Sequence, residues 1–270
     1  MEICKLFLII AIAGGMVLPA VTGCFAEVEK ATPIDSTEPA PISSPEIAKE
    51  TGKPEAPAPE NPVPLSQRED IILISKFYRG MGKEDVPKGW ELDDKKKPID
   101  ISLVKEGDQI AVRFKSENSA FGIYNTQDFD IRDYPFLNWE WKVSKLPAGG
   151  TFLDSDKDDQ GAQIYVSFGS LSWYNKPFVK AVGYYWSSTL PVGTEGPCPT
   201  WGKSQVIVVE TGKEKIGEWV AEKRNVYEDY VRLFDDKKPS DVSALRLYTN
   251  SQHTETGSEV YFRNVYFSKE

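Results

Sequence analysis

The chain has 270 residues, with 41 Asp and Glu against 32 Lys and Arg and a formal net charge of −9. This acidic balance argues against nucleic acid as a partner, because proteins that bind nucleic acid carry basic surface stripes. A single histidine excludes metal sites that need two imidazoles, and three cysteines cannot build a disulfide framework.

A short apolar segment opens the chain. The run from Leu6 to Leu18 is almost wholly apolar but shorter than the ~20 residues that span a bilayer. The tetrapeptide Val21–Cys24 follows and resembles the bacterial lipobox, at which signal peptidase cuts before a cysteine that then carries lipid. The resemblance implies that 1–23 is a lipoprotein signal peptide and that Cys24 anchors an exported protein of the cell envelope to a membrane, inner or outer. The alternative is ordinary secretion with cleavage after Ala26.

Residues 24–68 are predicted to form a disordered tether behind the lipidated cysteine. The stretch 27–68 holds nine prolines and no aromatic residue. Such a composition cannot bury enough apolar surface to offset the entropy of ordering, and proline favours extended backbone. We therefore expect a spacer that holds the following domain away from the membrane.

Residues 69–270 are predicted to form one all-β domain, and all seven Trp and all twelve Tyr lie there. Apolar and polar residues alternate in most of its strand-like runs, so that one face of each strand is buried and the other is solvated. Antiparallel sheets show this pattern more often than parallel ones. We therefore expect an antiparallel two-sheet β-sandwich, a jelly roll. The runs are 71–74, 110–114, 137–143, 164–168, 182–186, 206–209, 244–248 and 260–267.

Two local patterns predict particular side-chain positions. Trp139 and Trp141 share the apolar face of one strand and are expected in the core. A single helix is predicted over 225–234, with Asn225 as its N-cap. Arg224 and Asp229 flank its start, and we interpret them as an ion pair that ties the helix to the sheet, with ligand binding as the alternative.

Five motifs in this domain resemble the bacterial family known as domain of unknown function 3047. The resemblance covers essentially residues 69–270 and implies a galactose-binding-like β-sandwich, similar to carbohydrate-binding modules, with no established activity or catalytic residues. Before its last strand the family typically has an aspartate-rich turn, whereas this chain has amides and a histidine at 248–254. The motifs are Trp139–Val143, Lys157–Asp159, Tyr185–Trp186, Arg224–Val226 with Asp229–Tyr230, and Tyr261–Phe267.

The polar strand faces supply the candidate ligand site. Tyrosines beside charged side chains suit sugars, because a pyranose has apolar C–H faces and polar edges. If the alternation holds, these side chains point away from the core, so that substitutions would reduce affinity without reducing stability. The alternatives are an ordinary solvated face and, for Glu140, a cross-strand ion pair. The candidates are Arg113, Glu140, Lys142, Tyr165, Tyr185, Arg246 and Tyr248.

Other chemistry has weaker signals. Asp158 and Asp159 end an acidic loop and are candidate Ca²⁺ ligands, with a solvated loop as the alternative. Cys198 and His253 could pair as nucleophile and base, but nothing in the sequence places them together. No residue is assigned a catalytic role.

Three functions remain open at this point. We favour an envelope lipoprotein whose sandwich binds glycan without catalysis. The first alternative is a glycan-active enzyme that uses Asp or Glu, which predicts two carboxylates ~5–10 Å apart in a groove. The second is an envelope assembly factor with a protein partner, which predicts an exposed apolar patch.

Overall fold

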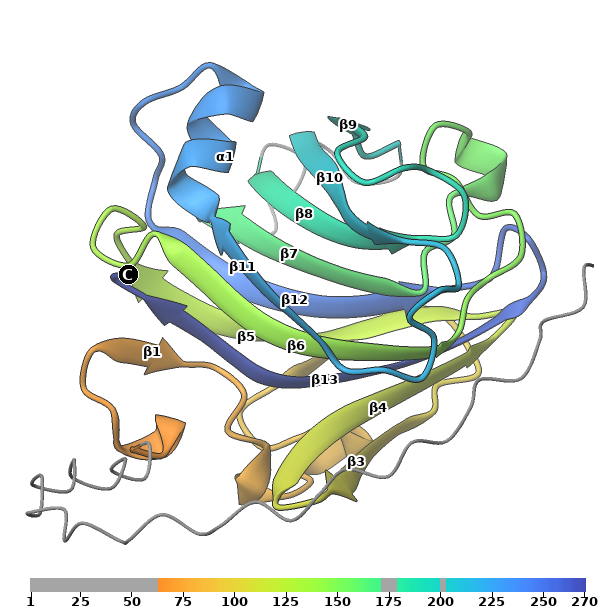
Figure 1. Ribbon diagram of the computed structural model, residues 1–270, viewed down its shortest axis with the longest axis horizontal. Coiled ribbons are helices and arrows are strands. Elements are labelled where there is room, and N and C mark those ends of the chain that lie inside the picture. The colour runs from red at the N-terminus through yellow and green to blue at the C-terminus, as the bar shows by residue number, and fades with distance from the viewer. Residues whose placement is uncertain (1–62, 171–178, 200–202) are drawn as a thin grey trace, which may run out of the picture. The chain divides into compact units, whose positions relative to one another are not determined.

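The computed structural model describes residues 63–170, 179–199 and 203–270 (Figure 1). The expected signal peptide, Cys24 and the tether up to residue 62 lie outside the described residues. Among the described residues, no helix is both long and apolar enough to cross a membrane.

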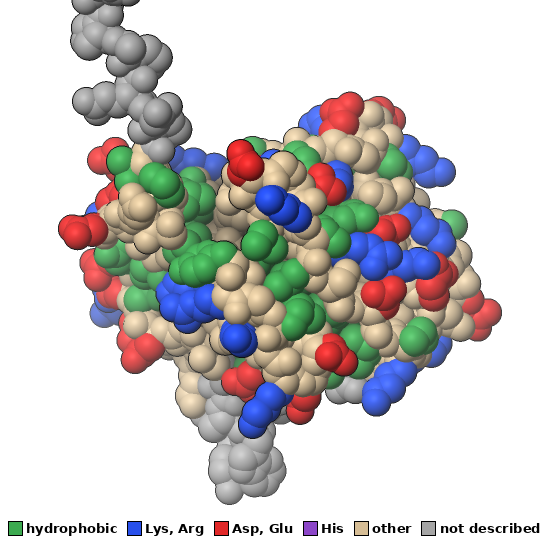
Figure 2. All heavy atoms as spheres, turned by 90° about the horizontal axis from the view of Figure 1, so that it is seen from below, with side chains coloured by type: hydrophobic (Ala, Val, Ile, Leu, Met, Phe, Trp, Pro, Cys, Tyr) green, Lys and Arg blue, Asp and Glu red, His purple; other side chains and the backbone are tan. Residues whose placement is uncertain are grey.

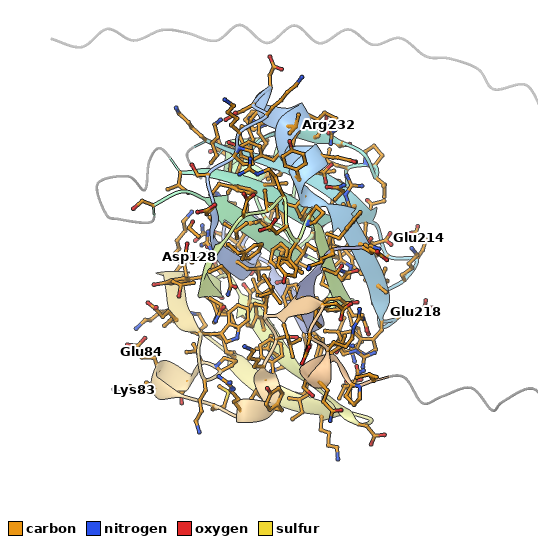
Figure 3. The ribbon with its side chains drawn as sticks, turned by 90° about the vertical axis from the view of Figure 1, so that its left-hand side faces the viewer. Lys83, Glu84, Asp128, Glu214, Glu218 and Arg232 are labelled. Carbon is orange, nitrogen blue, oxygen red and sulfur yellow. The ribbon has the colours of Figure 1, made fainter. Side chains whose placement is uncertain are left out.

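The described strands form two packed sheets, so the predicted jelly-roll β-sandwich is confirmed (Figure 1). Figure 3 views the two layers from one side, with Asp128 at the end of one layer and Glu214 and Glu218 beside the other. The first sheet runs in the order β11 (Val220–Asn225), β6 (Phe136–Lys145), β13 (Gly257–Ser268), β4 (Gln109–Glu117) and β3 (Ile101–Glu106), with β1 (Ile71–Leu73) also paired to β13. We call it the six-stranded sheet. The seven-stranded sheet runs β2 (Glu91–Lys96), β5 (Ala120–Phe129), β12 (Val242–Asn250), β7 (Ala162–Phe168), β8 (Lys180–Ser187), β10 (Lys203–Thr211) and β9 (Glu195–Pro197).

The core lies between the inner faces of the two sheets. Trp139 and Trp141 of β6 are 1% and 0% exposed, as their alternation predicts. Trp139 stacks on Tyr184 with ring centroids 5.3 Å apart, and Trp141 packs on Trp186 at 5.8 Å. Both partners belong to β8, so these aromatic pairs join one sheet to the other.

One strand pair departs from the antiparallel expectation. Strands β8 and β10 are parallel, with Val182 opposite Gln205. Parallel neighbours need a crossover of about a dozen residues or more, and β8 ends at Ser187 while β10 begins at Lys203. The crossover includes β9, which pairs antiparallel with β10.

Several strands lack the alternation on which the sequence analysis relied. The clearest case is β2, whose sequence Glu-Leu-Asp-Asp-Lys-Lys contains one apolar residue. It lies at an edge of its sheet. Charged side chains are common on edge strands because they oppose further strand pairing. The composition of this segment therefore did not predict a strand.

The predicted helix is α1 (Val226–Phe234), and its predicted cap is confirmed. The Asn225 side chain accepts a hydrogen bond from the Glu228 N–H at 3.1 Å. The Arg224 guanidinium donates to both carboxylate oxygens of Asp229, at 2.6 and 3.0 Å. The Tyr184 hydroxyl of β8 also donates to Asp229, at 2.9 Å, so the ion pair joins α1 to both sheets. Four short 3₁₀ segments complete the described helices: Leu65–Gln67, Phe77–Arg79, Lys83–Asp85 and Ser155–Lys157.

Candidate functional site

The structure divides the predicted ligand-binding residues between two separate faces. Arg113 lies on β4 and Glu140 on β6, both on the outer face of the six-stranded sheet. Tyr165, Tyr185, Arg246 and Tyr248 lie on β7, β8 and β12, on the outer face of the seven-stranded sheet. The core separates the two sets, so they cannot contact one ligand together.

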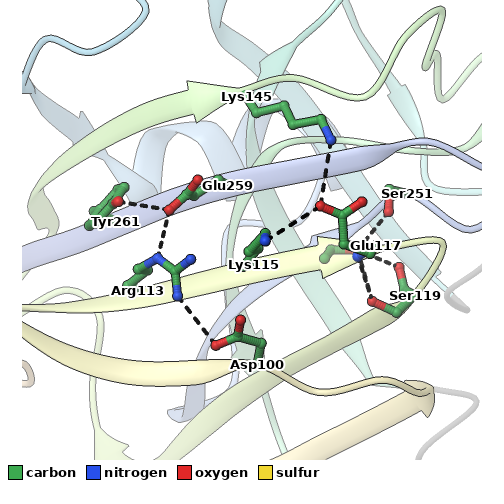
Figure 4. Close-up of polar contacts among 10 residues, drawn as sticks. Asp100, Arg113, Lys115, Glu117, Ser119, Lys145, Ser251, Glu259 and Tyr261 are labelled. Carbon is green, nitrogen blue, oxygen red and sulfur yellow. Dashed lines mark hydrogen bonds and ion pairs between the residues drawn. The ribbon is translucent and has the colours of Figure 1, made fainter.

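On the six-stranded sheet the candidate residues form cross-strand ion pairs. Arg113 donates to Glu259 at 2.6 Å and pairs with Asp100 at 3.3 Å, and the Tyr261 hydroxyl also donates to Glu259 (Figure 4). Glu140 accepts from Arg263 at 2.7 Å. The structure thus favours the ion-pair reading for Glu140.

The same face includes an aromatic residue that the sequence analysis missed. Trp219 precedes β11 and packs under Arg263, whose guanidinium carbon lies 3.9 Å from the ring centroid. Its indole N–H donates to Glu106 at 3.3 Å, and Glu106 also accepts from Lys142 at 2.6 Å. These charged groups pair with one another, so their positions are explained by contacts within the protein.

The outer face of the seven-stranded sheet carries two rows of directly opposed residues. Strand register, from β2 across to β10, sets both rows. The residues of these rows are here called the tyrosine–arginine face. The first row is Glu91, Tyr124, Arg246, Tyr165, Gly183 and Val206, and the second is Asp93, Gly122, Tyr248, Gln163, Tyr185 and Val208.

Two glycines leave room for two of the tyrosine rings on this face. A Cβ at Gly122 would lie 2.6 Å from Cδ2 of Tyr248, and a Cβ at Gly183 would lie 2.8 Å from Cε1 of Tyr165. Each ring therefore extends across the backbone of the neighbouring strand, in space that a side chain would otherwise take. Aromatic rings that cover strand glycines also help to fix register.

A buried arginine joins the two rows. Arg246 is 7% exposed and pairs with Asp93 at 2.5 Å. Its guanidinium carbon lies 4.1 Å from the ring centroid of Tyr248 and 5.7 Å from that of Tyr165. Neighbouring Tyr124 donates to Glu91, and this hydrogen bond, with some burial, raises the pKa of Tyr124 to about 12.

The expectation that these tyrosines lie on a solvated face was wrong. Tyr165, Tyr185 and Tyr248 are all buried, in a second hydrophobic cluster with Phe152 and Cys198. Burial raises the pKa of all three phenols, so they are protonated at neutral pH. The alternation correctly indicated that they point away from the main core, but it carried no information on the loops that cover them. Substitutions here will therefore affect stability as well.

Some buried polar atoms near this face have no hydrogen-bond partner among the described residues. They are the Tyr248 hydroxyl, the Ser204 hydroxyl and both amide atoms of Gln160. Native proteins satisfy nearly all buried polar groups, with protein atoms or ordered water. The Tyr248 hydroxyl is the one that lies on the face itself, beside Arg246.

The candidate calcium ligands serve the structure of a turn. The Asp159 carboxylate is fully buried and accepts bonds from the backbone N–H groups of His253 and Thr254, at 3.2 and 2.6 Å. It also accepts from the Thr254 hydroxyl at 2.7 Å. The backbone carbonyl of Asp158 accepts from Asn250. In the described part of the chain, no group of three or more acidic, His or Cys residues could hold a metal ion.

The hypothetical pair of Cys198 and His253 is not brought together by any contact among the described residues. The Cys198 sulfur lies 3.6 Å from the Tyr185 hydroxyl oxygen. The His253 ring contacts Gln252 in the turn that Asp159 holds. The two residues thus belong to different hydrogen-bond networks.

An apolar surface was the expectation for a protein-binding assembly factor. Hydrophobic side chains gather between charged ones on the side along which β3 and β4 lie (Figure 2). A groove of about 940 Å³ is lined there by Met81, Leu92, Ile99, Ile101 and Leu103, and also by Glu84, Asp85, Lys97 and Asp100. The lining is therefore a mixture of apolar and charged side chains.

A further carboxyl pair, Glu222 of β11 and Glu210 of β10, was not predicted from the sequence. Burial, with the nearby charge of Glu210, raises the pKa of Glu222 from its ordinary 4.5 to about 7. Glu210 itself is buried and pairs with Lys215 at 2.5 Å. The pKa of Glu222 is lowered by Lys215, Trp141 and Arg224, but their combined effect is smaller than that of burial. The alternating pattern could not reveal this pair, because a β-bulge in β10 changes the face of Glu210.

We expect Glu222 to make stability depend on pH. Its pKa is higher in the folded than in the unfolded protein, so the folded state holds the proton more tightly. The free energy of unfolding should therefore fall as pH rises from about 4.5 to about 7. Urea titrations across this range should show that Glu222→Gln loses this fall, whereas Glu218→Gln in the exposed loop keeps it. Identical pH profiles for wild type and Glu222→Gln would contradict the assignment.

Comparisons with known proteins place the domain in a family. The model of the family described as protein of unknown function (DUF3047) matches residues 88–266. The chain belongs to this family. No curated protein matches the sequence.

Three solved structures with a similar arrangement of strands illustrate the likeness. A family 11 carbohydrate-binding module of Clostridium thermocellum matches at 6% identity with a TM-score of 0.39, covering 73% of this chain and 94% of that one. The family 11 xylanase of Neocallimastix patriciarum matches at 10% identity and 0.39, covering 70% and 98%. The endoglucanase cel12A of Rhodothermus marinus matches at 7% and 0.37, covering 65% and 90%.

Proposed function

We propose that the domain is a non-catalytic glycan-binding module, and that its site is the open half of the tyrosine–arginine face. The open half comprises Glu91 and Asp93 of β2 and Tyr124 of β5, with Arg246 and Tyr248 of β12 at its inner limit. One observation carries the proposal. The register aligns phenol rings, a guanidinium and carboxylates in two adjacent rows on one sheet face. Sugars are bound by such combinations, because rings contact their C–H faces and polar groups bond their hydroxyls.

The protonation states of the site support binding rather than catalysis. Tyr124 and Tyr248 have raised pKa values, so their phenols are neutral hydrogen-bonding groups at pH 7 and not bases. The carboxylate of Asp93 is engaged by Arg246. The carboxylates of Glu91 and Asp93 each keep further lone pairs that can accept from sugar hydroxyls, and no proton transfer is required of the phenols.

A conservative substitution in the open half tests the proposal. Tyr124→Phe keeps the ring and removes the hydroxyl that lies between β5 and Glu91. We expect affinity for a retained glycan to fall about 3–10-fold, the loss that corresponds to about one neutral hydrogen bond. Affinity electrophoresis in gels containing mixed-linkage β-glucan, xyloglucan or xylan, with pull-down on isolated peptidoglycan, would measure it.

The matched control lies on the opposite sheet. Tyr261 is also partly buried and also donates its hydroxyl to a glutamate, Glu259. Tyr261→Phe should melt much as Tyr124→Phe does and should bind glycan as wild type does. Equal losses in both variants, or no retention on any of these materials, would refute the proposed site. Released oligosaccharides in the same incubations would favour the enzyme alternative instead.

We also propose that the module is held at a membrane of the cell envelope by lipid on Cys24. The lipobox-like tetrapeptide and the proline-rich stretch behind it support this. Several acyl chains on one residue would anchor it firmly, at about 0.8 kcal/mol for each buried CH₂ group. Growth of the native host with a labelled fatty acid should label wild type and leave Cys24→Ala unlabelled. Label on both would show that the lipid is elsewhere.

A further inference from the structure

Exposure on the tyrosine–arginine face decreases steadily from one edge of the sheet inward. In the first row Glu91 is exposed and Tyr124 is partly buried, whereas Arg246 and Tyr165 are 7% and 3% exposed. In the second row Asp93 is partly buried, and Tyr248 and Tyr185 are 5% and 0% exposed. The face is thus open along β2 and β5 and covered from β7 to β10.

Two chain segments that are tied together cover the inner half. Phe152 packs edge-on against Tyr185 with ring centroids 5.8 Å apart, and Cys198 contacts the same tyrosine. The Ser188 hydroxyl donates to the carbonyl of Pro147 at 2.6 Å, and the Thr189 hydroxyl donates to that of Gly150 at 2.8 Å. These bonds join the segment before β7 to the segment after β8, so the cover is part of the folded structure.

The end of β12 is closed in a similar way. The Asn250 N–H donates to the Gln160 carbonyl at 3.2 Å, and its side chain bonds the Asp158 carbonyl. The Gln163 amide donates to the Asn250 side chain at 2.7 Å. A ligand on the open half therefore meets protein both toward β7 and toward the end of β12.

We propose that this face receives the end of a glycan chain rather than an internal stretch of it. The inference rests on the proposed function of the same face. A chain bound internally needs an open path on both sides of the bound sugars, and the cover over β7, β8 and β10 closes one side. Tyr248 lies at the inner limit of the open half and is 5% exposed, and its buried hydroxyl has no hydrogen-bond partner among the described residues. A terminal sugar that enters along Tyr124 would supply that partner.

Stoichiometry on chains of increasing length tests the proposal. Isothermal titration calorimetry of the full domain would use cello-, xylo- and chito-oligosaccharides of two to six residues, followed by the parent polymer of any series that binds. For chain-end binding we expect one domain per chain at every length, and a Kd per chain that changes less than about threefold beyond the first two or three sugars. Reduction of the reducing end to an alditol, as a parallel series, shows which end is bound.

The outcomes separate the two proposals. More than one domain per polymer chain, or a Kd that keeps falling up to six sugars, would overturn chain-end recognition and leave glycan binding in place. Absence of binding in all series and on the polysaccharide panel would overturn both.

Tyr248→Phe adds an independent measurement, because it removes a hydroxyl that has no described protein partner. We expect it to melt at or above the wild-type temperature and to bind about 3–10-fold more weakly. Unchanged affinity would remove Tyr248 from the site and with it the argument for the inner limit.

Discussion

Replacement of Trp139 by alanine is expected to lower the free energy of unfolding by about 3–5 kcal/mol, which is much of the stability of a typical domain. The indole is 1% exposed and lies between the two sheets, against Tyr184 on one side and Trp141 on the other. Its removal leaves a cavity that neither sheet can close, because both neighbours are held by strand pairing. Urea denaturation followed by circular dichroism would measure the loss.

Trp219→Ala is the matched control for this substitution. Trp219 is a tryptophan of the same layer, but it lies on the outer face and is only partly buried. Its loss removes partly exposed cation–π contacts with Arg263 and Lys142 and one hydrogen bond, and it leaves no enclosed cavity, so we expect a cost of about 1–2 kcal/mol. A smaller loss for Trp139→Ala than for Trp219→Ala would mean that the core does not depend on the contact between β6 and β8.

Replacement of Asp229 by alanine is expected to cost about 3–5 kcal/mol, since it leaves buried partners without their acceptor. The carboxylate is 4% exposed and accepts bonds from Arg224, Arg232 and the Tyr184 hydroxyl. Tyr184 is fully buried in the core, so its hydroxyl cannot turn to water. Thermal and urea unfolding should both show the loss.

Two variants distinguish a structural from a ligand-binding role for this pair. Glu228→Ala removes an exposed acid one residue earlier in α1 and should cost no more than a few tenths of a kcal/mol. Asp229→Ala combined with Tyr184→Phe should recover part of the loss, because the second change removes the stranded hydroxyl. No recovery would show that the stability lost with Asp229 comes from the arginines alone.

Substitution of a buried residue on the tyrosine–arginine face is expected to change stability as well as binding. Arg246→Ala leaves the partly buried Asp93 without its partner and removes a contact of Tyr248. A loss of glycan binding in such a variant would not separate contact from folding. The substitutions of Tyr124 and Tyr248 to phenylalanine avoid this difficulty, because each retains the ring and its packing.

Local patterns in the sequence determined the strand faces and the helix of this protein. Alternation placed Trp139 and Trp141 in the core, since a strand turns successive side chains to opposite sides whatever its neighbours are. Asn225 marked the helix start, because capping needs only its own side chain and the next turn of backbone. The family motifs pointed to the same sandwich.

Tertiary structure alone decided which strand faces meet and what covers them. Glu140 and Arg246 have the same alternating context, yet they belong to different sheets, because strand order depends on pairing between distant segments. Tyr185 and Tyr124 both point outward from the same sheet, but Phe152 and Cys198 cover only Tyr185. The charged β2 joined the sheet because an edge strand needs little apolar surface of its own. A period of two residues defines two faces for each strand, and only long-range packing determines which of them remains open to a ligand.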